Sequence, residues 1–204
     1  MGGDELRGRR ERNKARTRSA VRHTALRLFT ERGYADTTVE QIADAAGVSA
    51  QTFFHYFACK RHVLLDEDMT DMIIEGFVGA PASLSPVAAY RHGLKTAYRS
   101  LTDSQRDAGM QTRSVISTAP DARAVLYTSY ARLVDLIADA LVTRRDAPTD
   151  GSERRVLAGA IVGVIIACSE TSPQPDREIL RGLTTLDEHL RRDHHRTATG
   201  VTDG

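Results

Sequence analysis

The sequence predicts an all-α protein of about nine helices, with an N-terminal three-helix domain followed by a larger helical domain. Ala, Leu and Arg are frequent among the 204 residues, and no stretch shows the two-residue apolar alternation of a half-buried strand. Apolar residues recur instead three and four positions apart, which is the spacing of an amphipathic helix. Gly, Pro and helix-capping residues divide the chain into segments of helical length. A chain this long can bury one large core or two small ones.

The first helix is predicted over residues 13–32, because Gly33 can end it and Tyr34 can fold back over its last turn. Residues 1–12 are predicted to form a disordered basic arm, since so densely charged a segment does not order by itself. The inner face of the helix carries Val21, Ala25, Leu28 and Phe29. The basic run that crosses from the arm into the helix consists of Arg7, Arg9, Arg10, Arg12, Lys14, Arg16 and Arg18.

A second and a third helix are predicted on either side of Gly47, joined by a tight turn. Thr38 is a good N-cap, and Gln41 three residues later completes the spacing of a capping box. Gly47 can adopt the positive φ of a sharp turn, and Ser49 can cap the third helix. Val39, Ile42, Ala43 and Ala46 form the apolar face of the second helix. A helix pair with so short a connection fits a recognition helix into the major groove of DNA, so residues 13–60 are predicted to be a DNA-binding domain.

The outward face of the third helix also favours DNA binding. Phe53 and Phe57 are expected to turn inward, whereas the outward positions and the helix exit carry hydrogen-bonding groups and cations. These outward residues are Gln51, Thr52, His55, Tyr56 and Lys60. Two alternatives remain open at this point: an ordinary αα-corner without nucleic acid, and a helical adaptor whose head no longer touches DNA.

The charge distribution agrees with a DNA-binding head. Residues 1–61 hold 12 Lys and Arg against 7 Asp and Glu, a net charge of +5, although the whole chain carries only +1. The remainder, residues 62–204, is therefore mildly acidic, with a net charge of −4. A positive head attracts phosphates, which dominate the affinity of proteins for DNA. The acidic remainder is repelled by DNA and is free for another role.

The stretch from residue 25 to residue 60 resembles the N-terminal DNA-binding domain of the TetR family of bacterial transcription regulators. The matching positions are Ala25, Phe29, Gly33, Tyr34, Thr37, Thr38, Val39, Ile42, Ala43, Ala46, Gly47, Val48, Ser49, Phe53, Tyr56, Phe57 and Lys60. The resemblance implies a regulator, expected to be a repressor, that a small-molecule effector releases from a near-palindromic operator in double-stranded DNA. It also implies a variable helical body that binds the effector and forms a homodimer.

Two positions depart from the family pattern. Phe54 stands where family members often have a Tyr whose hydroxyl reaches a backbone phosphate, so Phe54 is not expected to make that contact. Cys59 stands where Ser or Thr usually caps the next helix, and a thiol is a weaker acceptor, so that helix is expected to start less firmly. The residues predicted to contact DNA are Arg16, Arg18, Thr37, Thr38, Ser49, Ala50, Gln51, Thr52, His55, Tyr56 and Lys60.

The remaining helices are delimited by Gly, Pro and capping residues. Gly76, Gly79 and Pro81 mark a break, and Ser85 is placed to cap a helix whose first residue is Pro86. The predicted ranges are 60–77, 86–101, 104–117, 120–145, 152–170 and 176–192.

Residues 61–192 are expected to form the effector-binding and dimerisation domain, and residues 193–204 a disordered tail. Mixed apolar, Tyr and Arg faces between residues 104 and 145 suit a pocket that is mostly apolar with a few polar anchors, although an ordinary core would look the same. The candidate lining residues are Met110, Arg113, Ile116, Tyr127, Tyr130 and Val134. The effector is expected to be a largely apolar small molecule, whose identity the sequence does not give.

The helix at 152–170 is apolar almost all round, which predicts burial on several sides. Small residues recur along it every four positions and would let another backbone approach closely, either within the subunit or across a twofold axis. The resemblance favours the second interpretation, in which the last two helices of each subunit form a four-helix interface. The candidate interface residues are Gly159, Gly163, Ile166, Ala167, Leu183 and Leu186.

The remaining features argue against an enzyme and against a membrane protein. The seven His residues are scattered, and no set of His, Cys and Asp has the spacing of metal ligands. The sequence also contains no Gly-rich phosphate loop and no nucleophile elbow. We therefore expect no catalytic residue, metal or cofactor. The longest apolar run, residues 156–168, is too short to span a bilayer, and the N-terminus lacks the apolar segment of a signal peptide. These features predict a cytoplasmic protein with no membrane partner, and the widely separated Cys59 and Cys168 fit a reducing compartment.

Overall fold

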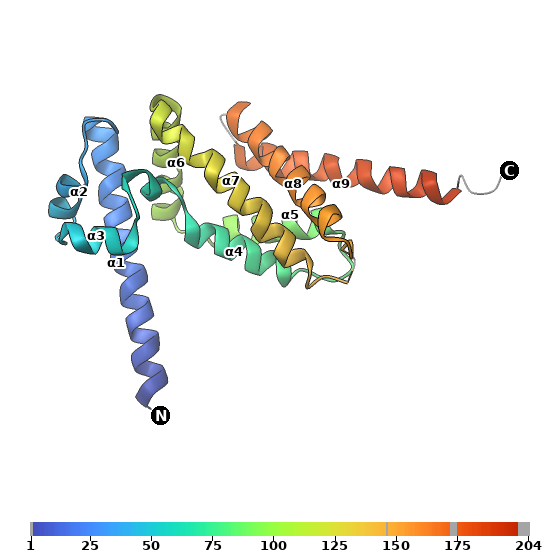
Figure 1. Ribbon diagram of the computed structural model, residues 1–204, viewed down its shortest axis with the longest axis horizontal. Coiled ribbons are helices and arrows are strands. Elements are labelled where there is room, and N and C mark those ends of the chain that lie inside the picture. Colours follow the sequence, from blue (N-terminus) through green and yellow to red (C-terminus); the bar gives the residue numbers. More distant parts are fainter. Residues whose placement is uncertain (1, 146, 172–174, 200–204) are drawn as a thin grey trace. The chain divides into compact units, whose positions relative to one another are not determined.

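The computed structural model describes residues 2–145, 147–171 and 175–199, which form helices, turns and short connections (Figure 1). The described residues contain nine α-helices and no strand, which confirms the all-α prediction. The α-helices are α1 (Gly2–Arg32), α2 (Val39–Ala45), α3 (Ala50–Tyr56), α4 (Glu67–Val78), α5 (Pro86–Ser100), α6 (Asp103–Thr118), α7 (Pro120–Leu141), α8 (Gly151–Thr171) and α9 (Pro175–Thr199), and η1 (Lys60–Leu64) is a 3-10 helix.

The chain forms two compact units. The first comprises α1, α2, α3, η1, α6 and the start of α7 up to Ser129, and the second comprises α4, α5, the rest of α7, α8 and α9. This division differs from the predicted one, in which residues 61–192 formed a single body. The reason is that Ala108 and Val115 of α6 and Val125 of α7 belong to the same buried apolar cluster as the α1 residues. We call the part of the first unit formed by α1, α2, α3 and η1 the head.

Two helices are longer than the sequence predicted. α1 begins at Gly2, so residues 2–12, which we expected to be a disordered arm, continue the helix. α9 runs to Thr199, past the predicted end at residue 192, and residues 200–204 of the predicted tail lie outside the described residues. In both cases a packed helix supplies the nucleus, and each further residue then adds a backbone hydrogen bond. Neither extension contains a Pro, and Arg is a good helix former.

η1 and α4 replace the single helix predicted over residues 60–77. Cys59 is the N-cap of η1 and makes no side-chain capping hydrogen bond, as expected for a thiol. Leu65 ends η1 with an extended backbone, at φ −85° and ψ 130°. The chain therefore leaves the head through a short 3-10 turn and an extended connection, and α4 starts afresh at Glu67.

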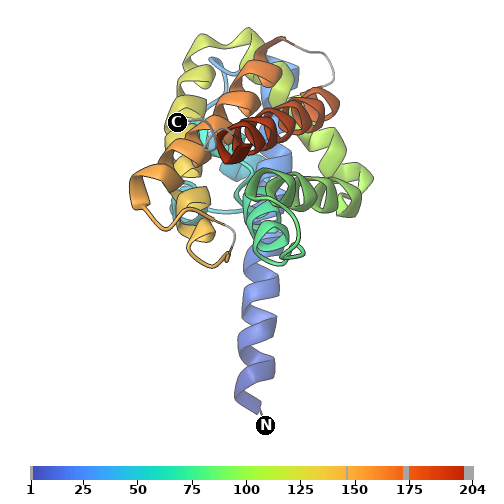
Figure 2. The ribbon, with the colours of Figure 1, turned by 90° about the vertical axis from the view of Figure 1, so that its right-hand side faces the viewer.

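The second unit is held by close helix contacts around α5, which α4 and α9 flank (Figure 2). The backbones of α4 and α5 touch at a glycine: a Cβ on Gly93 would lie 2.5 Å from both the Ile73 carbonyl oxygen and the Phe77 amide nitrogen. The buried guanidinium of Arg144 donates to the Leu84 carbonyl oxygen at 2.7 Å and lies over the Phe77 ring. Arg144 thereby fixes the connection between α4 and α5 to the end of α4. As predicted, α5 begins at Pro86.

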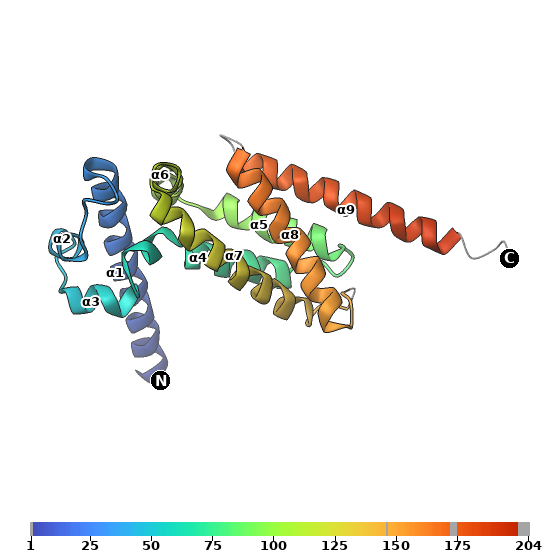
Figure 3. The same cartoon turned by 45° about the horizontal axis from the view of Figure 1, so that its top comes forward.

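α8 packs against the first half of α9 (Figure 3). Gly182 allows this approach, because a Cβ there would lie 2.7 Å from Val164 Cγ1. The prediction that α8 is buried on several sides is not met within this single chain. Ala158 and Ile161 are buried on one side, whereas Gly163 is exposed on another. Among the described residues, no helix, α8 included, is long and apolar enough to cross a membrane.

Candidate nucleic-acid interface

The capping box predicted for α2 is present. The backbone N–H of Gln41 donates to Thr38 Oγ1 at 3.2 Å, and the backbone N–H of Thr38 donates to Gln41 Oε1 at 3.0 Å. These two bonds satisfy amides that the first turn of a helix otherwise leaves unpaired. The start of α2 is thus fixed by residues that the sequence places three apart, and Thr38 remains exposed there.

The turn between α2 and α3 is equally well defined. Gly47 has a φ of +68°, which an L-residue with a side chain rarely adopts. Its N–H donates to the Asp44 carbonyl oxygen at 3.1 Å, and the next amide, that of Val48, donates to Ala43 at 3.0 Å. Ser49 Oγ then accepts from the backbone N–H of Thr52 at 3.0 Å and caps α3. The predicted helix–turn–helix geometry is therefore confirmed.

α3 exposes the residues that we predicted to read DNA. Phe53, with 0% of its surface exposed, anchors the helix in the core of the first unit, together with the buried Phe57. Gln51 and His55 lie four residues apart on the opposite face and are both exposed. The positions beside this exposed face are half-buried, and they are Ala50, Thr52 and Tyr56.

Two residues predicted to contact DNA have structural roles within the first unit. Thr37 is 1% exposed, and its hydroxyl donates to the Gly33 carbonyl oxygen at 2.8 Å, so its side chain cannot reach a partner. Lys60 Nζ donates to the carbonyl oxygens of Tyr34 and Thr37, at 2.7 and 2.9 Å, and lies 4.3 Å from the centre of the Tyr34 ring. Its ammonium group therefore ties η1 to the connection between α1 and α2. This structural role was not predicted from the sequence, and the phosphate contact of Lys60 stays a prediction.

The predicted basic run lies along α1. Arg16 is exposed, whereas the guanidinium of Arg18 lies 5.7 Å from the centre of the Phe57 ring, at the end of α3. A cation held beside α3 strengthens the positive field around the exposed face of that helix. The other described side chains of the run that are exposed belong to Arg9, Arg10, Arg12 and Lys14.

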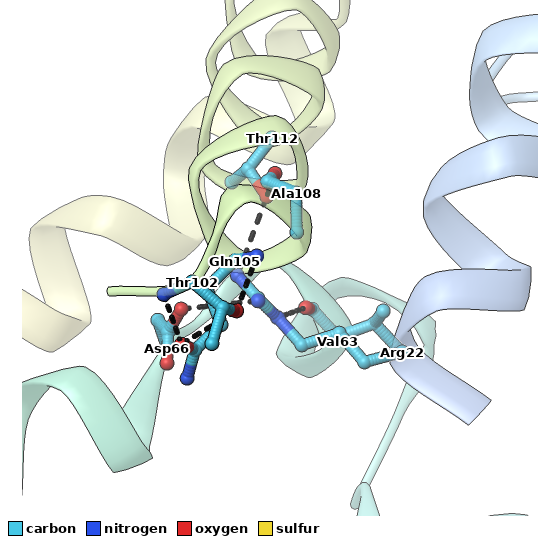
Figure 4. Close-up of polar contacts among 7 residues, drawn as sticks. All are labelled: Arg22, Val63, Asp66, Thr102, Gln105, Ala108 and Thr112. Carbon is cyan, nitrogen blue, oxygen red and sulfur yellow. Dashed lines mark hydrogen bonds and ion pairs between the residues drawn. The ribbon is translucent and has the colours of Figure 1, made fainter. Parts of the chain in front are cut away.

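An arginine that the sequence did not single out holds α6 to the head (Figure 4). Arg22 of α1 donates to the Val63 carbonyl oxygen at 3.1 Å, pairs with Asp66 at 3.0 Å and donates to Thr112 Oγ1 of α6 at 3.4 Å. Thr112 in turn donates to the Ala108 carbonyl oxygen at 2.8 Å. A guanidinium supplies the several donors that such a junction needs. Periodicity could not reveal it, because its partners lie 41 and 90 positions away along the chain.

The predicted effector residues are divided between the two units. Met110, Arg113, Ile116 and Tyr127 belong to the first unit, and Tyr130 and Val134 belong to the second. Met110, Arg113 and Tyr127 are exposed, whereas the other three are half-buried. Gln111 was not predicted, yet its Oε1 is buried and is the one such side-chain oxygen or nitrogen in the described part of the chain without a hydrogen-bond partner.

The predicted interface residues also fall into two groups. Gly163 and Ala167 are exposed on α8, and a Cβ added at Gly159 or Gly163 would meet no atom within 4 Å. Leu183, in contrast, is 0% exposed inside the core of the second unit, so it is not available to a partner subunit, and Leu186 packs against the same core. The correction follows from the packing of α9 against α5 and α8, which turns this apolar side of α9 inward.

Two family models match the chain in succession. Residues 21–66 match the model described as "Bacterial regulatory proteins, tetR family", and residues 84–194 match the model described as "MftR C-terminal domain". The second match alone covers more than half of the chain, and the first covers the helix–turn–helix pair α2–α3.

Two individual regulators of transcription are also similar to this chain in sequence. The HTH-type transcriptional regulator TcmR of Streptomyces glaucescens is 33% identical over 159 residues, which are 74% of this chain and 63% of TcmR. The chain thus spans less than two thirds of the length of that relative. MftR of Mycobacterium tuberculosis is 24% identical over 160 residues, which are 78% of this chain and 81% of MftR.

Solved structures share the fold. SmeT, the repressor of the Stenotrophomonas maltophilia multidrug efflux pump SmeDEF, aligns in its triclosan complex with a TM-score of 0.54. The alignment covers 83% of this chain and 88% of SmeT, at 18% sequence identity. Such low identity supports a common helical architecture and carries no residue-level role.

Proposed function

Because the chain belongs to the TetR family of bacterial regulatory proteins, we propose that it is a transcriptional repressor that binds operator DNA as a homodimer and releases it on binding a small molecule. The observation that carries the proposal is the capped α2–α3 pair, with Gln51 and His55 exposed on α3. The related proteins are regulators of transcription rather than enzymes. The place of action would be the cytoplasm, where the operator DNA lies.

DNA recognition is assigned to the exposed face of α3. α3 is short, and the Ser49 cap and the buried Phe53 hold it firmly, so it can enter the major groove without further ordering. A net charge of +5 on residues 1–61 supports attraction to phosphates on both sides of the groove. Selecting binding sequences from random DNA with the purified protein, followed by gel shifts on the selected sequences, tests this assignment.

Gln51→Ala is expected to change the sequence that the protein selects. A Gln side chain can pair with both N6 and N7 of an adenine, so its loss should weaken binding by about 1–3 kcal/mol at one base pair of each half-site. Arg16→Ala serves as the matched comparison: it should weaken binding to all sequences alike and reduce the slope of log affinity against log salt by about one. Unchanged selection and affinity in Gln51→Ala would contradict its role as a reader.

Deleting residues 1–12 is expected to lower operator affinity and to flatten its salt dependence. In the structure this segment continues α1 and carries the exposed Arg9, Arg10 and Arg12, which could settle along phosphates or in the minor groove. Each lost phosphate contact should reduce the salt slope by about one. Changing the three arginines to Gln keeps the helix and removes the charge, so this variant should behave like the deletion. A salt titration that matches the intact chain would show that the segment does not touch DNA.

The effector site is proposed to involve α6 and the part of α7 that belongs to the first unit. Within the first unit, the half-buried apolar side chains of Ile116 and Leu126 suit a largely apolar ligand, and the unpaired Oε1 of Gln111 offers an acceptor for a single donor group of that ligand. The solved complex of SmeT contains triclosan, a small molecule, which supports a ligand-binding role for a body of this fold. Titration of the protein–operator complex with triclosan as a probe would test for ligand-driven release.

The dimer interface is proposed to lie on the exposed face of α8. The Gly159 and Gly163 positions are open, and Ala167 continues the same strip, so a second backbone could approach closely. A twofold dimer places its two α3 helices about one turn of DNA apart or a multiple of it, which predicts a near-palindromic operator.

A further inference from the structure

Phe54 is an exposed aromatic side chain on the helix that we assign to DNA recognition. Its exposed fraction is 52%, and no other large apolar residue is exposed among the described side chains of the first 66 residues. A single exposed apolar residue on a protein surface is ordinary. The position of this one needs an explanation, because it lies on α3 in the positively charged part of the chain.

The Phe54 ring is held in place by the core beneath it. It meets the ring of Phe53 edge to face, with the ring centres 5.6 Å apart and the planes at 88°. Phe53 is itself fully buried, and it packs against Phe57 with ring centres 5.5 Å apart. A ring supported in this way loses little conformational freedom when a partner covers its exposed half.

Helical spacing places Phe54 directly beside the proposed reader. Residues three and four apart are neighbours on a helix surface, so Phe54 adjoins Gln51 on one side and Ala50 on the other. The exposed face of α3 therefore combines an amide that can pair with a base edge and an aromatic ring that cannot hydrogen-bond. In the major groove, the C5-methyl group of thymine is the apolar feature that base pairs present, and Phe is among the side chains that contact it.

We propose that Phe54 contacts the C5-methyl group of a thymine next to the base pair that Gln51 reads, and so helps determine the operator sequence. The inference rests on the proposed function. Residues 1–61 carry a net charge of +5, which attracts the negatively charged DNA. We therefore infer that DNA, rather than another protein, covers the Phe54 ring. The phosphate backbone is a poor alternative, because a phenyl ring offers no donor to a phosphate oxygen.

The test removes the methyl group from the DNA and the ring from the protein. The operator selected by the intact chain is resynthesised with each thymine replaced in turn by deoxyuridine, which lacks only the C5-methyl group. At one thymine of each half-site, uracil should reduce the affinity of the unchanged protein about 4-fold, the effect expected for losing the burial of one methyl group. Phe54→Ala should bind the thymine operator more weakly and should show no further loss with uracil at that position.

Two further variants test whether the effect of uracil depends on the apolar side chain at position 54. Phe54→Leu, which keeps an apolar contact, should retain part of the preference for thymine over uracil. Val142→Ala removes an exposed apolar side chain from the second unit and should bind both operators like the unchanged protein. Thermal unfolding followed by circular dichroism shows whether each variant folds, which is expected because Phe54 is half exposed.

Several outcomes would overturn the inference while leaving the proposed function intact. One is an equal loss with uracil in the unchanged protein and in Phe54→Ala, because another residue would then contact the methyl group. Others are a selected operator without thymine in its half-sites, and the absence of a uracil effect at every position. Failure of the unchanged chain to select any DNA would overturn the proposed function itself, and this inference with it.

Discussion

Gly93→Ala is expected to lower the free energy of unfolding by about 1–3 kcal/mol, the usual range for overpacking a tight contact. The added Cβ would lie 2.5 Å from both the Ile73 carbonyl oxygen and the Phe77 amide nitrogen, and 2.9 Å from the Gly76 carbonyl carbon. All three are backbone atoms of α4, so no side chain can rotate away. α4 and α5 would have to separate, and the loss of their packing should exceed the roughly 1 kcal/mol that Ala gains over Gly in a helix. Denaturant unfolding measures the change.

Gly109→Ala is the matched control for this prediction. Gly109 is also inside a helix, α6, but a Cβ there would approach only Arg113 Nη1, at 3.9 Å. The substitution should therefore leave stability unchanged or raise it by up to about 1 kcal/mol. If Gly93→Ala unfolded at the same denaturant concentration as the unchanged protein, the close approach of α4 and α5 would not describe the molecule in solution.

The parts of the candidate site that the sequence predicted well are those set by neighbours along the chain. The Thr38–Gln41 capping box, the positive φ of Gly47 and the Ser49 cap each depend on residues at most three or four positions apart. Local chemistry determines such features, so residue type and spacing suffice to predict them. The inward turn of Phe53 and Phe57 was predictable for the same reason, because it follows from helical periodicity.

The features that the sequence did not reveal depend on residues far apart in the chain. The sequence predicted a phosphate contact for Lys60 but not the hydrogen bonds of its ammonium group to the Tyr34 and Thr37 carbonyl oxygens, more than 20 positions away. Arg22 was not noticed, although it joins α1 to η1 and α6. Periodicity identifies the buried face of a helix but not the helix that covers it. For this reason the sequence did not reveal that Ala108 and Val115 of α6 share a buried apolar cluster with residues of α1.

Gly163→Leu is expected to split the proposed dimer and to reduce operator affinity about 100-fold or more. Gly163 is exposed on α8, and a Cβ there would meet no atom within 4 Å, so a single subunit can accept the leucine without strain. Between two closely packed α8 helices, the same side chain would push the backbones apart. Two half-sites bound by one dimer gain roughly 10²–10⁴ in affinity from their linkage, and separate subunits lose that gain. Analytical ultracentrifugation with a gel shift on the same sample measures both effects.

Two variants separate this effect from damage to the subunit. Gly163→Ala adds only a methyl group to the strip, so it should disturb the dimer less than leucine does. Val142→Ala shortens an exposed apolar side chain of the second unit that lies outside α8, and it should leave the dimer intact. None of these positions lies in the first unit, which contains α3. A loss of operator binding in Gly163→Leu would therefore have to result from the loss of subunit association. A Gly163→Leu protein that sediments as a dimer and binds operator normally would place the interface elsewhere on the chain.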